Sequence, residues 1–387
     1  MGYATSSCSI RGSNYNNGPV TENSTAANVC VGGVCGIAGS SVDISNVENR
    51  SAGVITLKNT HTTPCVGGVV GWRNNANINN SKNYADIIIE GVNLRAGGFA
   101  AIGGIVGNAD QSTNSTTISG CECSGSIITK KQASGSSATD LQPASASETA
   151  TSYIGGIAAY NGTGSGNRTF SGCKFTGNIS LYCSARAYVG GIIGSATVCP
   201  TGCIVQNANV TNQNANITYI RQSQTTIGGT ANAVTTGEGA IGGIVGFIDT
   251  DAISGNTFDG SIYTRDVTAS LNSDPYALAG GIVGCTGTAT DVTISDCKVN
   301  GTFRGNQVTN QTAGLFIGSD GTLAKLTLTG CKVQISTTVH YNYSGSSTAI
   351  ATDAGVTKAR CIGGKYSSVT NANFSKNSGI AVASIYD

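Results

Sequence analysis

Residues 102–107 read Ile-Gly-Gly-Ile-Val-Gly, and this six-residue motif recurs along the whole chain. Identical or altered copies are VGGVCG at 31–36, VGGVVG at 66–71, IGGIAA at 154–159, VGGIIG at 189–194, IGGIVG at 241–246, AGGIVG at 279–284 and AGLFIG at 313–318. We interpret Ile362-Gly363-Gly364 as the opening of a last copy. Copies start about 35 residues apart, with some steps lengthened by insertions. A recurring period of this kind is the signature of a repeat architecture.

A second element follows the Gly-Gly motif in each unit. It reads ISGCECSGSI at 118–127, FSGCKFTGNI at 170–179, ISGNTFDGSI at 253–262, ISDCKVNGTF at 294–303 and, more weakly, LTGCKVQIST at 328–337. We interpret residues 8–12, CSIRG, as a half-unit of it. Short β-branched segments bounded by Gly and Asn favour strands and turns. Each unit therefore predicts three strands: one at the Gly-Gly motif, one around the Cys and one after the next Gly.

The composition supports an all-β fold. Gly supplies 55 of the 387 residues and only 11% of residues are charged, against about 25% in an average soluble domain. Residues that favour helices are scarce, which excludes a helical bundle. Hydrophobic residues still make up 39% of the chain, enough to build a core and to argue against low-complexity disorder.

Repeats too small to bury a face alone must stack on one another. We therefore predict an all-β parallel β-solenoid, or β-helix, of about nine coils with insertions along one edge. A single domain spans 1–387, with an N-terminal arm or cap at 1–29, coils at 30–370 and a C-terminal strand at 371–387. A β-propeller is the alternative, but a blade needs four strands and each unit predicts three.

The units IGGIVG…TISGCECSGSI and AGGIVG…TISDCKVNGTF resemble GLUG repeats, which occur in bacterial surface and secreted proteins and are expected to form β-solenoids. The resemblance covers nearly all of the chain and is clearest over residues 30–335. It implies an extracellular or cell-surface protein that serves as a stalk, an adhesin or a spacer beside an enzyme. Ser81 and Asn256 depart from the Cys form of the repeat, so Cys is not essential to the coil.

The chain has 14 Cys, many of them at two recurring positions. One position lies two residues before the Gly-Gly pair and holds Cys30, Cys65 and Cys361. The other lies in the second element and holds Cys8, Cys121, Cys173, Cys297 and Cys331. Because Lys174, Lys298 and Lys332 follow the Cys directly, strand alternation predicts that these Cys face the core.

Two interpretations of the cysteines remain open. They form either a ladder of buried reduced thiols or disulfides between coils, whose equivalent Cα atoms lie about 4.8 Å apart, within the range of a disulfide. The favoured pairs are Cys30 with Cys65 and Cys297 with Cys331, and Cys199 and Cys203 could close a local loop. A metal site is not expected, because the chain has no C-x-x-C pair and only two His.

The search for chemistry predicts no catalytic residue and no cofactor. His61 and His340 are far apart and are expected to be solvated. Residues 237–242 form G-x-G-x-x-G, but a strand follows in place of the helix that phosphate binding needs. Asp249 and Asp251 fit a solvated turn as well as a pair of catalytic acids. Tyr residues and Trp72 could stack on sugars, or serve ordinary packing.

Other features bear on location and partners. Asn114, Asn161, Asn178 and Asn300 are candidate glycosylation sites in Asn-x-Ser/Thr triplets. A net charge of +1 offers no basic surface for phosphates, so we expect no nucleic-acid partner. No apolar run approaches the length of a membrane helix, and the opening residues do not form a signal peptide. Insertions at 130–152, 219–239, 265–276 and 338–360 share one edge, as a binding face or as decoration.

These observations together predict a non-enzymatic extracellular or cell-surface protein with a structural or adhesive role, as the subunit of a fibre or filament. The partners expected are other copies, joined end to end, and surface glycans or host proteins. The Asn-rich stretch 14–28 could be an arm that reaches the neighbouring copy, or a cap. The alternative is a secreted glycan-binding module or a carbohydrate-active enzyme on a β-helix scaffold. Fold alone does not decide between them.

Overall fold

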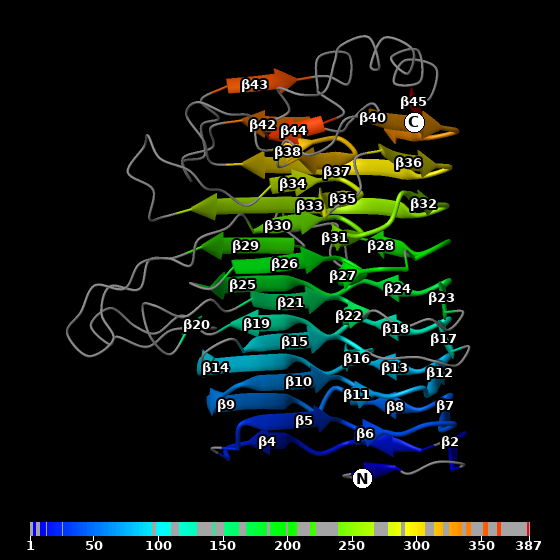
Figure 1. The fold of residues 1–387 in the computed structure, drawn as a ribbon, viewed down its shortest axis with the longest axis vertical. Helices are drawn as coiled ribbons and strands as arrows, with labels where there is room; N and C mark the ends of the chain where they lie inside the picture. The colour runs from blue at the N-terminus through cyan, green and yellow to red at the C-terminus, as the bar shows by residue number, and fades with distance from the viewer. Residues whose placement is uncertain are drawn as a thin grey trace, which may run out of the picture.

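The chain is seen in a computed structural model as a stack of β-coils that climbs from the N-terminal to the C-terminal strands (Figure 1). The structure describes residues 3–4, 8–12, 14–24, 26–94, 98–109, 116–129, 142–143, 151–161, 168–183, 186–198, 200–206, 217–221, 239–266, 278–287, 291–305, 313–319, 325–334, 338–341, 351–354, 362–364 and 385–386. Every strand in these ranges pairs in parallel with the equivalent strand of a neighbouring coil, except that β42 and β43 pair antiparallel. The predicted parallel β-solenoid is confirmed.

Each coil passes through four sheets, which we number in chain order from the Gly-Gly motif. Sheet 1 holds eight strands and ends at the first Gly of each motif. Its strands are β5 (Asn28–Gly32), β10 (Thr63–Gly67), β15 (Phe99–Gly103), β21 (Thr151–Gly155), β26 (Arg186–Gly190), β30 (Ala240–Gly242), β34 (Leu278–Gly280) and β38 (Ala313–Gly314).

Sheet 2 follows the motif and holds ten strands, one for each level of the stack. They are β1 (Tyr3–Ala4), β6 (Cys35–Ala38), β11 (Val70–Arg73), β16 (Val106–Asn108), β22 (Ala158–Asn161), β27 (Ile193–Ala196), β31 (Val245–Ile248), β35 (Val283–Thr286), β39 (Ile317–Ser319) and β44 (Ile362–Gly364). The last strand pairs Ile362 with Ile317 and Gly363 with Gly318. The sequence suggested that Ile362-Gly363-Gly364 opens another unit. Its pairing shows instead that this segment occupies the sheet 2 position that follows a Gly-Gly motif.

Sheet 3 carries the residues just before the Cys position. Its strands are β2 (Ser9–Arg11), β7 (Asp43–Ser45), β12 (Asn77–Asn79), β17 (Thr116–Ser119) and β23 (Arg168–Ser171), then β32 (Ala252–Ser254), β36 (Asp291–Ser295) and β40 (Lys325–Thr329). Thr201 links the two groups through bridges to Ser171 and Ser254. The register places Ile10, Ile44, Ile78, Ile118 and Phe170 in one buried column.

Sheet 4 takes two strand positions in most coils. The first is occupied by β3 (Tyr15–Asn16), β8 (Glu48–Asn49), β13 (Lys82–Asn83), β18 (Glu122–Cys123), β24 (Lys174–Phe175), β28 (Ile204–Gln206), β41 (Lys332–Gln334) and β45 (Ile385–Tyr386). The second is occupied by β4 (Val20–Glu22), β9 (Ile55–His61), β14 (Ile87–Leu94), β19 (Ile127–Thr129), β25 (Ile179–Cys183), β29 (Ile217–Arg221) and β42 (Thr338–Tyr341). Long strands β33 (Thr257–Asp266) and β37 (Lys298–Gly305) span both positions, while β20 (Gln142–Pro143) and β43 (Ala351–Ala354) extend the sheet.

The corner between sheets 3 and 4 is turned by one residue in the left-handed conformation. Its positive φ is 56° at Asn46, 49° at Asn80, 59° at Gly120 and 52° at Asp296. Gly, Asn and Asp are the residues that adopt this conformation most readily. A full coil thus contains up to five strand segments, where the sequence predicted three. The Gly-Gly motif bends the chain between two strands, and the Cys sits at a corner, outside any strand.

Several described residues fall in regions for which the sequence predicted another arrangement. β2, β3 and β4 lie within 1–29 and pair with β7, β8 and β9, so this part of the chain forms a coil and not a free arm. In the predicted C-terminal strand only Ile385–Tyr386 is described, and it pairs with β41. The insertions at 130–152, 219–239, 265–276 and 338–360 lie largely outside the described residues. No helix in the described part of the chain is long and apolar enough to cross a membrane.

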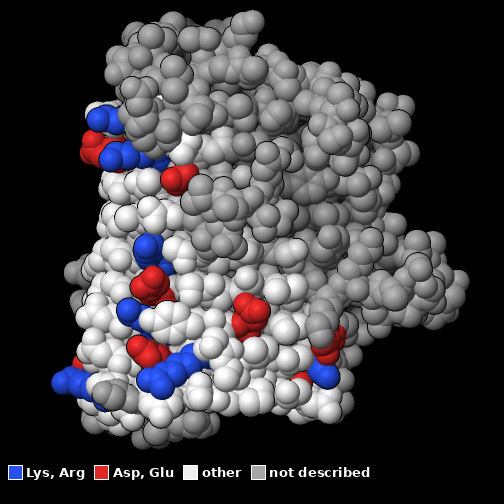
Figure 2. Space-filling view, turned by 180° about the vertical axis from the view of Figure 1, so that it is seen from behind, with Lys and Arg blue, Asp and Glu red and all other residues white. Residues whose placement is uncertain are grey.

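The surface of the coils is polar where sheet 4 faces outward. Glu48, Lys82, Glu122 and Lys174 are in register there and alternate in sign. The Nζ atom of Lys82 lies 3.8 Å from Oε2 of Glu122. Seen from behind, much of the charge on the described surface lies in one vertical row (Figure 2). Exposed ion pairs of this kind contribute little to stability but keep the face well solvated.

Candidate functional site: an aromatic seam and a column of buried thiols

Glycine brings the outer faces of sheets 1 and 2 together at the Gly-Gly motif. A Cβ atom on Gly67 would lie 1.9 Å from the carbonyl oxygen of Val70, and one on Gly71 would lie 2.5 Å from the backbone nitrogen of Val31. Gly71 is on sheet 2 of its coil, whereas Val31 is on sheet 1 of the coil before. The two sheets therefore meet backbone to backbone, and the surface folds inward along this line.

Side chains on the outer faces of the two sheets fill this inward fold. Sheet 1 contributes residues at and near the position two before Gly-Gly, and sheet 2 contributes residues after the motif. We call this set the aromatic seam: Cys30, Cys65, Trp72, Phe99, Ala101, Tyr153, Ala159, Tyr160, Tyr188, Ala240, Phe247 and Cys285. The seam forms two small apolar clusters that are separate from the main core.

The rings of the seam touch both along the rod and across the fold. Along sheet 1, Tyr153 and Tyr188 are in register and stack with centroids 6.0 Å apart and 26° between planes. Across the fold, Tyr153 approaches Tyr160 to 4.9 Å and Tyr188 approaches Phe247 to 4.7 Å. Phe99 meets Tyr153 edge-on at 5.9 Å. Such pairs add about 0.5–1.5 kcal/mol each beyond their buried area.

The seam is also chemically distinct from the charged row on sheet 4. Its members carry no charge, and its rings are only partly buried. Partly exposed aromatic edges and phenol hydroxyl groups suit contact with a neutral ligand that has both apolar and hydroxyl surfaces. The sequence analysis identified Cys30 and Cys65 at the position two residues before Gly-Gly. It did not identify Tyr153 and Tyr188, which stand at the same position.

A second axial feature lies at the corner between sheets 3 and 4. In successive coils the residue there is Val47, Ser81, Cys121, Cys173, Cys203, Asn256, Cys297 and Cys331, all buried. The residue after each one hydrogen-bonds back to the preceding coil, as in Lys174 N–H to Cys121 O and Ile204 N–H to Cys173 O. We call these residues the corner column. Cys8 does not belong to it, because Ser9–Arg11 pairs with Asp43–Ser45 and so places Cys8 beside Val42.

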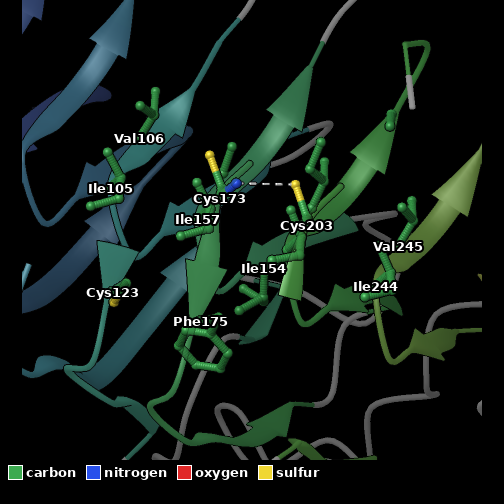
Figure 3. Packing of buried hydrophobic residues seen from close by; sticks show 14 of the residues in the cluster. Ile105, Val106, Cys123, Ile154, Ile157, Cys173, Phe175, Cys203, Ile244 and Val245 are labelled. Atoms are coloured by element: carbon green, nitrogen blue, oxygen red, sulfur yellow. Dashed lines mark hydrogen bonds between the residues drawn. The ribbon is translucent and has the colours of Figure 1, made fainter. Parts of the chain in front are cut away.

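The thiols of the corner column have recurring partners. The side chains of Cys121, Cys173, Cys203 and Cys331 donate to the carbonyl two residues earlier, over 3.5–3.6 Å, and Ser81 does the same at 3.1 Å. The backbone N–H of Cys173 also donates to Sγ of Cys203 at 3.4 Å, and both residues sit among buried Ile and Val side chains (Figure 3). The inward orientation predicted for Cys121, Cys173, Cys297 and Cys331 is the one observed.

Burial raises the pKa of the Cys297 and Cys331 thiols. It raises the pKa of Cys297 to about 12, and likewise that of Cys123 on β18. Hydrogen bonding to Cys121 and Cys203, followed by burial, raises the pKa of Cys173 well above its usual range. A hydrogen bond from the Cys173 thiol lowers the pKa of Cys121, which is only 1% exposed. A thiolate is the nucleophile in cysteine chemistry, so the neutral thiols of Cys173, Cys297 and Cys331 act as small hydrophobic groups. Their role at the corner is packing.

The described cysteines are free thiols, which supports the interpretation as a ladder and not as disulfides. Cys65, Cys121, Cys173, Cys203, Cys297 and Cys331 are buried and Cys30 is half-buried. In-register side chains of a parallel pair leave the backbone in the same direction, so their Cβ atoms also stay about 4.8 Å apart. A disulfide needs about 3.5–4.5 Å, so the Cα spacing alone was a misleading guide. Cys199 and Cys361 lie outside the described residues.

A ladder of Asn side chains supports the first three coils. Asn16 Nδ2 donates to Asn49 Oδ1 and Asn49 Nδ2 donates to Asn83 Oδ1, each at 2.8 Å. Asn49 also donates to the carbonyl of Gly53 at 3.1 Å. The ladder ends where Asn83 Nδ2 meets Sγ of Cys123 at 3.6 Å. These amides, of which Asn49 and Asn83 are buried, are satisfied by one another and by their own turns.

His61 is buried, so the expectation that it is solvated is wrong. Its Nε2 lies 2.9 Å from Oε2 of Glu22 and 2.6 Å from the carbonyl of Lys58, and its Nδ1 lies 2.8 Å from the carbonyl of Ala26. Only oxygen atoms face the ring nitrogens. The pair fastens the second coil to the first.

The other candidate residues are not brought together into a site. His340 belongs to β42, but its side chain lies outside the described residues. Asp249 and Asp251 are exposed in a turn after β31, and residues 240–242 of the G-x-G-x-x-G match are strand β30. Among the described His, Cys, Asp and Glu, no group of three or more is placed to hold a metal ion.

The four candidate glycosylation sites differ in what the structure describes. Asn178, just before β25, and Asn300 on β37 are half-buried, and Asn300 Nδ2 donates to Asp259 Oδ1 at 2.8 Å. Asn161 ends β22, but its side chain is not described, and Asn114 lies outside the described residues.

The fold and its axial columns define this chain as a parallel β-solenoid repeat protein. No protein-family model, no curated protein and no solved structure matches it.

Proposed function

We propose that this protein is a non-enzymatic structural or adhesive rod of the cell surface or extracellular space, with the aromatic seam as its contact face. The observation that carries the proposal is how the polar and reactive side chains are used. The corner thiols, the Asn ladder and the His61–Glu22 pair all join one coil to the next. A fold whose polar and thiol side chains mainly connect its own coils is suited to a mechanical or display role. The GLUG-like repeats support the same class.

Self-association end to end is part of this proposal. Among the described residues β5 pairs only with β10, so one edge of sheet 1 presents backbone groups along the rod axis. An unpaired edge of this kind is a template for another strand, and a contact that does not close produces a filament. Light scattering and negative-stain imaging of the purified protein test it. Filaments that lengthen with concentration are expected, whereas particles of monomer size at every concentration would rule it out.

The seam favours a glycan-binding role as a second candidate. A linear neutral polysaccharide presents apolar ring faces and hydroxyl groups in repeated units, which match the uncharged rings and phenols of successive coils. Pull-down on insoluble neutral polysaccharides tests this role with Tyr153→Ala and Tyr188→Ala variants. Tyr84→Ala is the matched control, because Tyr84 is 36% exposed and lies between β13 and β14, away from the seam. Equal retention of all the variants and the wild type would exclude the seam as the glycan site.

A further inference from the structure

Cys30 differs from the thiols of the corner column in its position. It lies on β5 and faces outward into the first coil of the aromatic seam, where it is half-buried. The register places it beside Cys65 of the next coil, which is 3% exposed. The two thiols therefore stand side by side on the outside of the solenoid, one within reach of solvent and the other covered.

The neighbouring thiol affects the ionisation of Cys30. In the corner column a hydrogen bond from the Cys173 thiol likewise lowers the pKa of Cys121, but Cys121 is only 1% exposed, whereas Cys30 is half-buried. At Cys30 the hydrogen bond comes from the Cys65 thiol, and it lowers the pKa of Cys30 by more than burial raises it. A donor aimed at the sulfur stabilises the thiolate, which is the nucleophilic form.

We propose that Cys30 is a modification site that undergoes S-thiolation by small disulfides, with Cys65 as the positioning donor. The Cys30 thiolate attacks one sulfur of R–S–S–R, the S–S bond breaks, and RS⁻ leaves while a mixed disulfide forms on Cys30. Cys65 does not displace the adduct, because in-register Cβ atoms of parallel strands stay about 4.8 Å apart, beyond the disulfide range. This inference is independent of the proposed function, since it needs neither a filament nor a glycan.

The test uses the full-length folded protein, pre-reduced and freed of reductant, with DTNB as the small aromatic disulfide. The released aromatic thiolate reports the rate, and peptide mapping of the product locates the adduct. One fast adduct on Cys30 is expected, and Cys30→Ser removes it. Cys8→Ser is the matched control, because Cys8 is the other described thiol that is half-buried, and it leaves the fast phase unchanged.

Variants at Cys65 separate its positioning role from simple exposure of Cys30. Cys65→Ala removes the donor and moves the pH profile of the fast phase to higher pH. Its rate at neutral pH falls about threefold for each unit of pKa, because a more basic thiolate is also more nucleophilic. Cys65→Ser keeps a donor and retains the wild-type profile. The proposal is overturned by a fast adduct on another cysteine, by an internal Cys30–Cys65 disulfide, or by identical profiles in wild type and Cys65→Ala.

Discussion

The backbone N–H of Cys173 donates to Sγ of Cys203 in the next coil over 3.4 Å. One coil further on, the N–H of Cys203 donates in the same way to Oδ1 of Asn256 over 3.0 Å. A thiol sulfur and an amide oxygen therefore act as equivalent acceptors at this corner. This equivalence explains how an Asn can stand in a column that is otherwise mostly Cys in the later coils.

Replacing Asn256 with Ala should destabilise the rod more than replacing it with Cys. Asn256 Nδ2 donates to the carbonyls of Pro200 and Ser254, each at 2.8 Å, and Oδ1 accepts from Cys203. Ala leaves these buried groups unpaired, at a cost of roughly 2–4 kcal/mol. Cys keeps an acceptor and a donor at the corner, as its neighbours do, and should cost about 1 kcal/mol. Urea denaturation of the two variants measures the difference, and equal midpoints would refute the equivalence.

Replacing Asn49 with Asp should produce a fold whose stability depends on pH. The amide nitrogen of Asn49 donates to Gly53 O and Asn83 Oδ1, whereas a carboxylate would present only acceptors to them. A buried charge without a partner costs about 3–5 kcal/mol. Lowering the pH protonates the introduced carboxyl group and restores one donor, so stability should recover on acidification and fall again as the pH rises. Asn49→Ala is the control, since its loss should show no such pH dependence.

The Gly-Gly motif should tolerate no side chain at its first glycine. A Cβ on Gly67 would lie 1.9 Å from Val70 O and 2.6 Å from Ile105 O, both fixed by strand pairing. Gly67→Ala is therefore expected to cost about 3 kcal/mol or more. Gly18→Ala is the matched control, because a Cβ there meets nothing within 4 Å, and it should change stability by no more than about 1 kcal/mol. Thermal unfolding of both variants decides the point.

The buried thiols should make the protein sensitive to alkali. The pKa of Cys123 and that of Cys297 are raised from an ordinary 9.0 to about 12 in the folded chain. The neutral form favours folding, so this stabilisation is complete below pH 9 and is lost as the pH rises from about 9 towards 12. Each thiol contributes at most about 1.4 kcal/mol per pH unit in that window.

The measurement is the urea midpoint as a function of alkaline pH. A Cys123→Ala, Cys297→Ala double variant should start less stable but lose stability less steeply above pH 9. Cys8→Ala is the control for removing a thiol that is only half-buried. Parallel slopes for all three proteins would show that the buried thiols do not set the alkaline limit.

The sequence was sufficient to predict the parallel solenoid and the inward phase of the corner cysteines. Both depend on local periodicity, which the repeat displays many times over. The predicted number of three strands per coil was too low. The prediction assumed that side chains alternate between inside and outside without interruption, although the chain bends within each predicted strand. Val69 and Val70 are adjacent yet both lie in the main core, which a single straight strand does not allow. At the corner between sheets 3 and 4, the bend was marked in the sequence by the Gly, Asn or Asp that stands before each residue of the corner column.

The seam and the His61–Glu22 pair depend on tertiary geometry that periodicity does not encode. Tyr153 contacts Tyr160, and Tyr188 contacts Phe247, because sheets 1 and 2 fold towards each other. Close backbone contacts at the glycines set the angle between the two sheets. His61 is buried because the segment after β4 crosses over it. The sheet 1 half of the seam does repeat in the sequence, at the position two residues before Gly-Gly, but the contact across the fold and the His61–Glu22 pair leave no such pattern.

The parallel pairing of the coils also decides how the rod carries load. Its backbone hydrogen bonds run along the long axis, and most described coils are joined to the next through several sheets at once. Tension spread evenly over a coil must break all of these bonds together, whereas tension applied through one chain end loads only the strand at that end and peels coils away in turn. The resistance of the same molecule to tension therefore depends on where it is anchored: it is high when the load is spread over a whole coil and low when the load acts on one chain end.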